Sequence, residues 1–150
     1  KWSTVYVNTG AFQSDSSRDA IKDFDVSGNM TKIIQSGNSG TYPAAYAALN
    51  YAPFSALTSK GKWMLPTAGI LNSLYTNLNA INNTIFKLDG TELMGDDEHI
   101  WSSSEHANYS AWFFCTNIST GAGQGGIDWG SKGEFSDYLA PPVVRPVIAF

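Results

Sequence analysis

The sequence predicts a single α+β domain in which helices come first and a small antiparallel sheet follows. Apolar residues recur at three- and four-residue steps between Leu71 and Ile85, which is the spacing of one helix face. After Gly95 that period disappears, and short apolar runs alternate with polar and glycine-rich segments, as in strands joined by loops. No internal repeat or linker divides the 150 residues, so we expect one domain over residues 1–150.

The first forty residues are expected to form a strand, a short helix and a loop. Residues 2–7 alternate enough to predict a first strand. Residues 14–24 predict the start of a short helix, with Asp15 or Ser16 as its N-cap. The glycines and polar residues of segment 36–40 predict a loop.

Two helical regions are expected in the middle of the chain. Residues 42–49 are rich in alanine, and Pro43 suits a first helical turn. The longest helix opens at residues 66–67, and its asparagine-rich middle predicts a break near Asn79, because Asn is a poor residue inside helices. The pair at residues 89–90, Asp-Gly, predicts the closing turn.

The last strand is expected to be short or to lie at a sheet edge. Residues 143–150 are apolar, but three prolines punctuate this part of the chain and remove backbone donors. Arg145 is a lone cation in this strand, and such a residue is usually paired. We expect its partner to be Glu105 or an acid of segment 96–98.

Composition excludes several classes of function. Hydrophobic residues make up 43% and charged residues 15% of the chain, which is typical of a folded domain. A net charge of −4 argues against nucleic-acid binding, and no apolar run is long enough to insert into a membrane. The chain begins at Lys1 rather than Met, so we expect a processed or excised piece, compatible with a place in a larger surface protein.

The aromatic content indicates recognition as one use of these residues and core packing as the other. Aromatic residues reach 13%, with five Trp and seven Tyr. Tyr and Trp offer large contact areas at low entropic cost. The segment from Ile100 to Phe150 places aromatic anchors between short polar runs, so we expect the binding region to lie within residues 100–150.

Three arrangements with possible chemistry each have a simpler interpretation. Residues 121–126 match GxGxxG, but residues 127–130 do not predict the helix that a dinucleotide site needs, so a strand-to-strand loop is preferred. The acidic run at residues 96–99 is read as a solvated loop rather than a metal site. Cys115 with His106 or His99 would make a nucleophile–base pair, but its apolar surroundings favour a small hydrophobe.

From these interpretations we expect no catalytic residues, no metal site and no cofactor. The single cysteine also excludes an internal disulfide and a cysteine-clustered zinc site.

Several segments together resemble one family. The chain is similar, over roughly residues 40 to 150, to C-type-lectin-fold domains of bacterial surface and fimbrial proteins. These are related to formylglycine-generating-enzyme-like modules, and many are variable proteins of diversity-generating retroelements. The resemblance is carried by Tyr42-Pro-Ala-Ala-Tyr-Ala-Ala, Gly61-Lys-Trp-Met-Leu-Pro-Thr-Ala-Gly69, Ile100-Trp-Ser-Ser-Ser-Glu105, Ala111-Trp112 and Val144-Arg-Pro-Val-Ile-Ala-Phe150.

The resemblance implies a C-type lectin fold, with two main helices packed on a small antiparallel sheet and long loops. It also implies a non-enzymatic ligand-recognition module of bacterial or phage origin, on a cell surface or outside the cell. Its partner would be a protein or glycan. The implied scaffold consists of Trp63, Leu65, Pro66, Trp101, Trp112, Arg145 and Phe150.

In such variable proteins the diversified residues lie near the C-terminus, between scaffold positions. If Trp112, Phe114 and Thr116 point inward, strand alternation turns Phe113, Cys115 and Asn117 to solvent. The expected ligand-binding face is His106, Asn108, Tyr109, Ser110, Phe113, Cys115, Asn117, Asp128, Trp129, Ser131, Ser136, Asp137 and Tyr138.

The chain departs from the family at three points. Ile70 replaces the acidic residue of the usual helix start, although Thr67 can still cap. The signatures of calcium-dependent sugar binding are absent, and a lone Cys115 cannot reproduce the cysteine pair of the formylglycine-generating enzymes. The leading interpretation is therefore an adhesin-like binding module. A structural fimbrial subunit is the first alternative, and an oxidising or hydrolytic enzyme of the formylglycine-generating type is the second.

Overall fold

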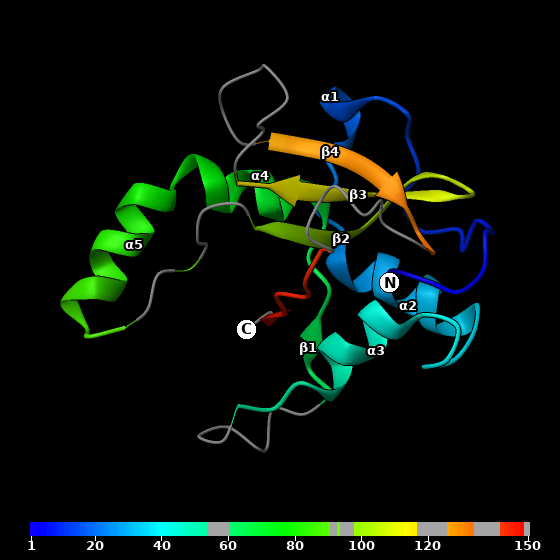
Figure 1. Cartoon of the computed structure of the whole chain (residues 1–150), viewed down its shortest axis with the longest axis horizontal. Helices are drawn as coiled ribbons and strands as arrows, with labels where there is room; N and C mark the ends of the chain where they lie inside the picture. Colours follow the sequence, from blue (N-terminus) through cyan, green and yellow to red (C-terminus); the bar gives the residue numbers. More distant parts are fainter. Residues whose placement is uncertain (54–60, 91–92, 94–97, 117–125, 134–141, 149–150) are drawn as a thin grey trace.

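The structure is a computed structural model that describes residues 1–53, 61–90, 93, 98–116, 126–133 and 142–148 (Figure 1). Over these residues the chain has a mixed α+β architecture, with five helices and two small antiparallel sheets. The helices are α1 (Ser17–Ala20), α2 (Val26–Gln35), α3 (Pro43–Asn50), α4 (Ala68–Thr76) and α5 (Leu78–Lys87). The strands are β1 (Trp63–Met64), β2 (His99–Ala107), β3 (Ser110–Cys115), β4 (Gly126–Ser131) and β5 (Val147–Ile148).

The helices in the middle of the chain begin where their capping residues predict. Helix α3 has Pro43 in its first turn. Helix α4 begins after Thr67, whose hydroxyl accepts a hydrogen bond from the Ile70 N–H at 3.3 Å, so the expected cap is confirmed. The predicted break lies at Asn77 rather than Asn79 and separates α4 from α5.

The N-terminal segment differs most from the prediction. The expected strand over residues 2–7 is wrong, because these residues have an irregular conformation. They are held by other contacts: the backbone N–H groups of Trp2 and Ser3 both donate to the Lys132 carbonyl, at 2.9 and 3.0 Å. Helix α2 was not predicted, and its N-cap Asp25 accepts from the Gly28 N–H at 2.9 Å.

The larger sheet has the strand order β2–β3–β4, and all its pairs are antiparallel. Strands β2 and β3 are joined by the turn at Asn108 and Tyr109. In the next pair Trp112 lies opposite Trp129. Strand β4 begins at Gly126, so a strand follows the glycine-rich segment where a dinucleotide site would need a helix. Residues 121–125 of that segment lie outside the described residues.

The smaller sheet pairs β1 with β5 and has two residues in each strand. The expectation of a short final strand is therefore confirmed. Just before β5, Arg145 Nη2 lies 2.6 Å from Glu98 Oε1. Of the two partners expected for Arg145, the acid of the 96–98 segment is correct and Glu105 is not, because Glu105 pairs with Lys132.

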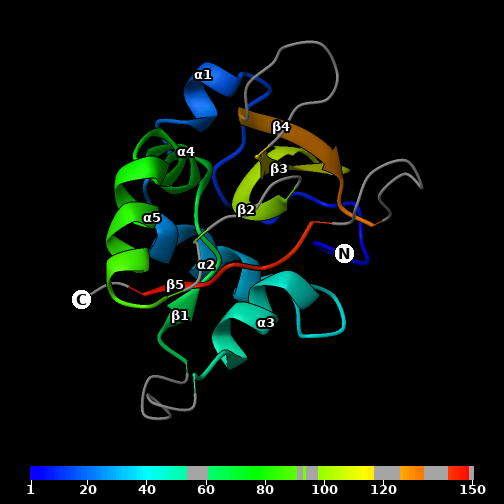
Figure 2. The same ribbon diagram turned by 60° about the vertical axis from the view of Figure 1, so that its left-hand side comes forward.

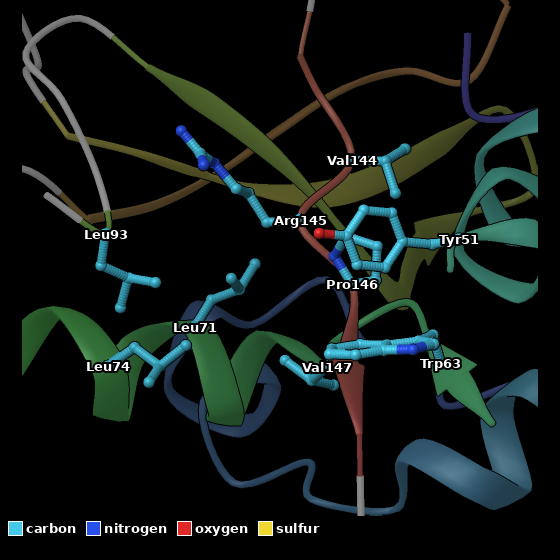
Figure 3. A pocket seen from close by; sticks show the side chains of 9 residues that line it. All are labelled: Tyr51, Trp63, Leu71, Leu74, Leu93, Val144, Arg145, Pro146 and Val147. Carbon is cyan, nitrogen blue, oxygen red and sulfur yellow. The ribbon is translucent and has the colours of Figure 1, made fainter. Parts of the chain in front are cut away.

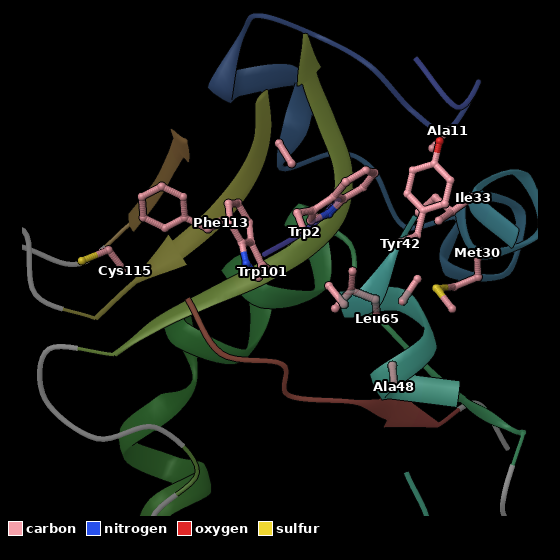
Figure 4. Packing of buried hydrophobic residues seen from close by; sticks show 13 residues of the cluster. Trp2, Ala11, Met30, Ile33, Tyr42, Ala48, Leu65, Trp101, Phe113 and Cys115 are labelled. Carbon is pink, nitrogen blue, oxygen red and sulfur yellow. The ribbon is translucent and has the colours of Figure 1, made fainter. Parts of the chain in front are cut away.

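All six residues of β3 are buried. On one face Trp112 packs with Ala20 and Ala68, and Phe114 packs against Leu71 of α4. On the other face Phe113 meets the ring of Trp101 edge-on, in a cluster that also includes residues of α2 and α3 (Figure 4).

The exposure expected for Phe113 and Cys115 is therefore wrong, since only 2% and 4% of their surfaces are accessible. Side chains alternate along β3 as predicted, but both faces of this central strand are covered. The prediction assumed that one face of the sheet is open to solvent, as in many antiparallel sheets, and β3 has no such open face.

Close packing of α4 on the chain before α2 depends on a glycine. A Cβ on Gly69 would lie 2.3 Å from the Asp23 carbonyl oxygen, nearer than any real Cβ contact. The Gly69 N–H donates to that same oxygen at 3.1 Å. Helix α5, in contrast, buries none of its residues; it projects from the body of the molecule in Figure 1 and comes toward the viewer in Figure 2.

Candidate functional site

Exposed aromatic and polar side chains gather where the β2–β3 turn meets the edge strand β4. We call this surface the aromatic face; it consists of His106, Asn108, Tyr109, Asp128 and Trp129. Of these, Tyr109 is 57% exposed and Trp129 48% exposed. Trp129 lies on β4 and Tyr109 in the turn between β2 and β3, so the larger sheet is a rigid scaffold that presents both side chains to solvent.

Stacked rings form the centre of the aromatic face. The imidazole of His106 lies parallel to the Trp129 indole, with centroids 4.5 Å apart and an interplanar angle of 8°. The same imidazole meets buried Trp112 edge-on at 5.0 Å. Its Nδ1 lies 2.8 Å from the Ser110 hydroxyl. Two ring contacts and one hydrogen bond therefore fix the orientation of His106, and through it that of Trp129.

The N-terminal segment borders this face. It forms a parallel bridge beside β2, in which the Glu105 N–H donates to the Phe12 carbonyl at 2.7 Å and the Ser14 N–H donates to the Glu105 carbonyl at 3.1 Å. The Trp112 indole N–H also donates to the Ser14 carbonyl, at 2.9 Å. These bonds place Asp15 close enough to His106 to influence its charge.

The pKa of His106 is lowered from its ordinary value because burial penalises the charged imidazolium. The carboxylates of Asp15 and Asp128 act in the opposite direction and favour the proton, but they do not outweigh the loss of solvation. The imidazole is therefore neutral at neutral pH, while the surface around it is negative.

The depressed pKa of His106 predicts a loss of stability in mild acid. A histidine whose folded pKa lies below its unfolded value of about 6.5 binds protons more readily in the unfolded chain. Its contribution to stability is thus complete above about pH 6.5 and is lost as the pH falls toward the lowered folded pKa. We expect urea midpoints measured between neutral pH and pH 5 to fall less in His106→Gln than in the parent. Parallel curves for the two proteins would contradict this assignment.

The structure brings together only part of the predicted binding residues. Asn108, Tyr109, Asp128 and Trp129 are exposed, whereas His106 and Ser131 are partly buried. Ser110, Phe113 and Cys115 are buried and cannot contact a ligand without rearrangement of the core. Four predicted positions lie outside the described residues: Asn117, Ser136, Asp137 and Tyr138.

A buried ion pair anchors the strand ends behind the aromatic face. Lys132 Nζ lies 2.6 Å from Glu105 Oε1, and both side chains are fully buried. The ammonium also donates to the Val7 carbonyl at 2.9 Å and lies 4.8 Å from the centre of the Trp2 ring. Burial raises the pKa of Glu105 and lowers that of Lys132, while each charge opposes the shift in its partner.

The structure also joins one cysteine–histidine pair that was considered as a nucleophile and base. Cys115 Sγ lies 3.3 Å from His99 Nε2. Both residues are buried, and the His99 ring packs on Phe113 with centroids 5.4 Å apart. Burial in an aromatic cluster favours a packing role for this thiol.

A pocket of about 280 Å³ lies between α4 and the segment leading into β5 (Figure 3). Tyr51 and Trp63 meet edge-on at 5.0 Å in its wall, and Arg145 is the one charged residue among the described residues of its lining. The guanidinium of Arg145 is already paired with Glu98. The remaining lining is apolar: Leu71, Leu74, Leu93, Val144, Pro146 and Val147. The described lining of this pocket therefore offers mainly hydrophobic contact.

Within the described ranges, no three His, Cys, Asp or Glu side chains are grouped so that they could hold a metal ion. No helix in the part of the chain that the structure describes is long and apolar enough to cross a membrane.

No protein-family model matches the chain, and no match was found among curated proteins or among solved structures. Sequence reasoning found four exposed residues of the aromatic face and missed Asp15, which no local pattern connects to His106.

Proposed function

We propose that this chain is a non-enzymatic recognition module with a C-type lectin fold, which presents the aromatic face to a protein or glycan on another cell or surface. The observation that carries the proposal is the exposure of Tyr109 in the β2–β3 turn and of Trp129 on β4, beside the fully buried strand β3. Aromatic residues held by a rigid scaffold and flanked by polar groups are typical of binding hot spots.

The arrangement of the scaffold supports this proposal. Trp101 and Trp112, two residues of the implied scaffold, are buried on neighbouring strands. Asn108 and Tyr109 lie between these strands in the turn, where changes of side chain disturb no packing. A surface with these properties tolerates diversification, which is the behaviour that the resemblance implies.

Replacing Tyr109 and Trp129 by Ala is expected to abolish binding while leaving the fold intact. Loss of a hot-spot aromatic residue removes about 2 kcal/mol or more of binding free energy, which weakens binding about thirtyfold or more. The measurement uses a fluorescent tetramer of the domain, applied to a glycan array and to panels of intact bacterial and host cells. Near-ultraviolet circular dichroism of each variant checks the fold.

Phe86→Ala is the matched control, because Phe86 on α5 is 54% exposed and lies outside the aromatic face. It should bind as the parent does. Equal losses in the control and in the Tyr109 and Trp129 variants would remove the case for this face. Assembly of the parent into filaments that depend on Trp129 would instead support a structural fimbrial subunit.

A further inference from the structure

We propose that the aromatic face binds a cationic side chain, an arginine or lysine of a protein partner. This inference rests on the proposed function and names the chemistry of its ligand. Two observations support it: the negative charge around Trp129, and a buried site in the same molecule where an indole and a carboxylate together hold a lysine ammonium.

The charge around the aromatic face is negative, and none of the ion pairs among the described residues neutralises it. The electrostatic influences on His106 come from two carboxylates, Asp15 and Asp128. Neither belongs to the three ion pairs found among the described residues. Asp128 accepts a hydrogen bond from the Trp129 backbone N–H at 2.8 Å, and its carboxylate also lies close enough to His106, whose ring stacks on Trp129, to favour a proton there.

The stacked rings supply the second half of a cation site. Trp129 has the most electron-rich ring among the natural side chains, and the partial negative charge of its face attracts ammonium and guanidinium groups. Its neighbour His106 is neutral at neutral pH, because burial lowers its pKa. The site therefore brings no cation of its own, and a ligand cation would balance the two carboxylates.

The interior of the protein contains the same combination already occupied. The Lys132 ammonium lies 4.8 Å from the Trp2 ring centre and 2.6 Å from the Glu105 carboxylate. There an indole and a carboxylate together hold one cation. On the aromatic face an indole and two carboxylates are exposed, and no described cation pairs with them.

A cation is favoured over the other ligand classes. Phosphate would be repelled by Asp15 and Asp128, and the net charge of −4 adds to that repulsion. A neutral sugar could stack on Trp129, but it would leave both carboxylates without a counter-charge. An arginine or lysine gains from the ring and from the carboxylates together.

The test is a titration of the isotopically labelled domain followed by NMR of its tryptophan indole N–H groups. Trp129→Phe identifies the Trp129 signal among those of the five tryptophans. The probes are a capped pentapeptide with two arginines, the same peptide with citrulline in place of arginine, and methyl glycosides. We expect the arginine peptide to shift the Trp129 signal and the citrulline peptide to bind at least about fivefold more weakly.

Charge variants sharpen the result. Asp15→Asn and Asp128→Asn should each weaken the arginine peptide about twofold to fivefold, and added salt should do the same. Asp89→Asn is the matched control, because Asp89 is an exposed acid just after α5. Its backbone has a positive φ, which Asn also adopts readily, so the substitution should not disturb the fold. It should bind the peptide as the parent does.

Other outcomes overturn the inference without ambiguity. The proposal of a cationic ligand would be wrong if the citrulline peptide bound as tightly as the arginine peptide. It would also be wrong if the arginine peptide did not shift the Trp129 signal at up to millimolar concentration. Shifts with a glycoside alone would assign the face to sugars. If Trp129→Ala removes tetramer binding to cells while arginine has no effect, the proposed function stands and only the cationic ligand fails.

Discussion

Replacing Lys132 by Met is expected to lower the free energy of unfolding by about 3–5 kcal/mol, because the substitution leaves a buried carboxylate without its counter-charge. Glu105 is fully buried, and Lys132 is its ion-pair partner at 2.6 Å. The substitution also removes the donor to the Val7 carbonyl and the cation over the Trp2 ring. Urea unfolding followed by tryptophan fluorescence measures the change.

The double variant Glu105→Leu with Lys132→Met separates charge from packing. Removing both charges should recover most of the loss, since an apolar pair of similar volume often matches or exceeds a buried ion pair in stability. The N-terminal segment would still lose the acceptor that Glu105 offers to the Thr9 N–H. A double variant as unstable as Lys132→Met alone would show that packing, rather than unpaired charge, dominates.

Asp23→Ala is expected to lower the free energy of unfolding by about 2–4 kcal/mol, because it leaves two buried donors without an acceptor. The Asp23 carboxylate accepts from Asn29 Nδ2 at 2.7 Å and from Ser104 Oγ at 2.6 Å. Ser104 in turn accepts from the Ala68 N–H at 3.0 Å. One carboxylate therefore connects α2, β2 and the start of α4.

Asp19→Ala is the matched control for Asp23. Asp19 is an exposed acid that pairs with Lys22 at 2.9 Å, an arrangement that contributes at most about 1 kcal/mol. Thermal and urea unfolding of the two variants should differ accordingly. Similar losses in both would mean that the buried network contributes no more than a surface ion pair.

Local sequence signals, such as a proline in the first turn or an N-cap residue, were sufficient to predict the helices that contain them. Pro43 and the alanines after it predicted α3, and Thr67 predicted the start of α4. Helix α2 has the N-cap Asp25, but Gly28 and Asn29 near its start are poor helix formers and weaken the local signal. It is stabilised by burial of Met30 and Ile33, a tertiary contribution that no local window reveals.

The residues of the candidate site could be predicted only where their exposure depends on contacts between residues that are close in the sequence. Asn108 and Tyr109 were predicted as solvent-facing residues next to a strand, and the structure exposes both in the turn that joins β2 to β3. The burial of Phe113 and Cys115 on β3 could not be predicted, because the alternation of side chains does not show which faces of a strand are covered. Asp15 was missed for a different reason: its place depends on bonds from Ser14 to Trp112 and Glu105, about ninety residues away.

The burial of β3 on both sides also determines where the sequence of this region can change. Each residue from Ser110 to Cys115 contacts the core, so a random substitution there removes volume or introduces strain, at a typical cost of about 1–3 kcal/mol. Asn108, Tyr109 and Trp129 at the rim have no such restriction. The larger sheet thus combines a buried strand that resists substitution with a few exposed positions that tolerate it. New binding specificities can arise at these positions without loss of the fold.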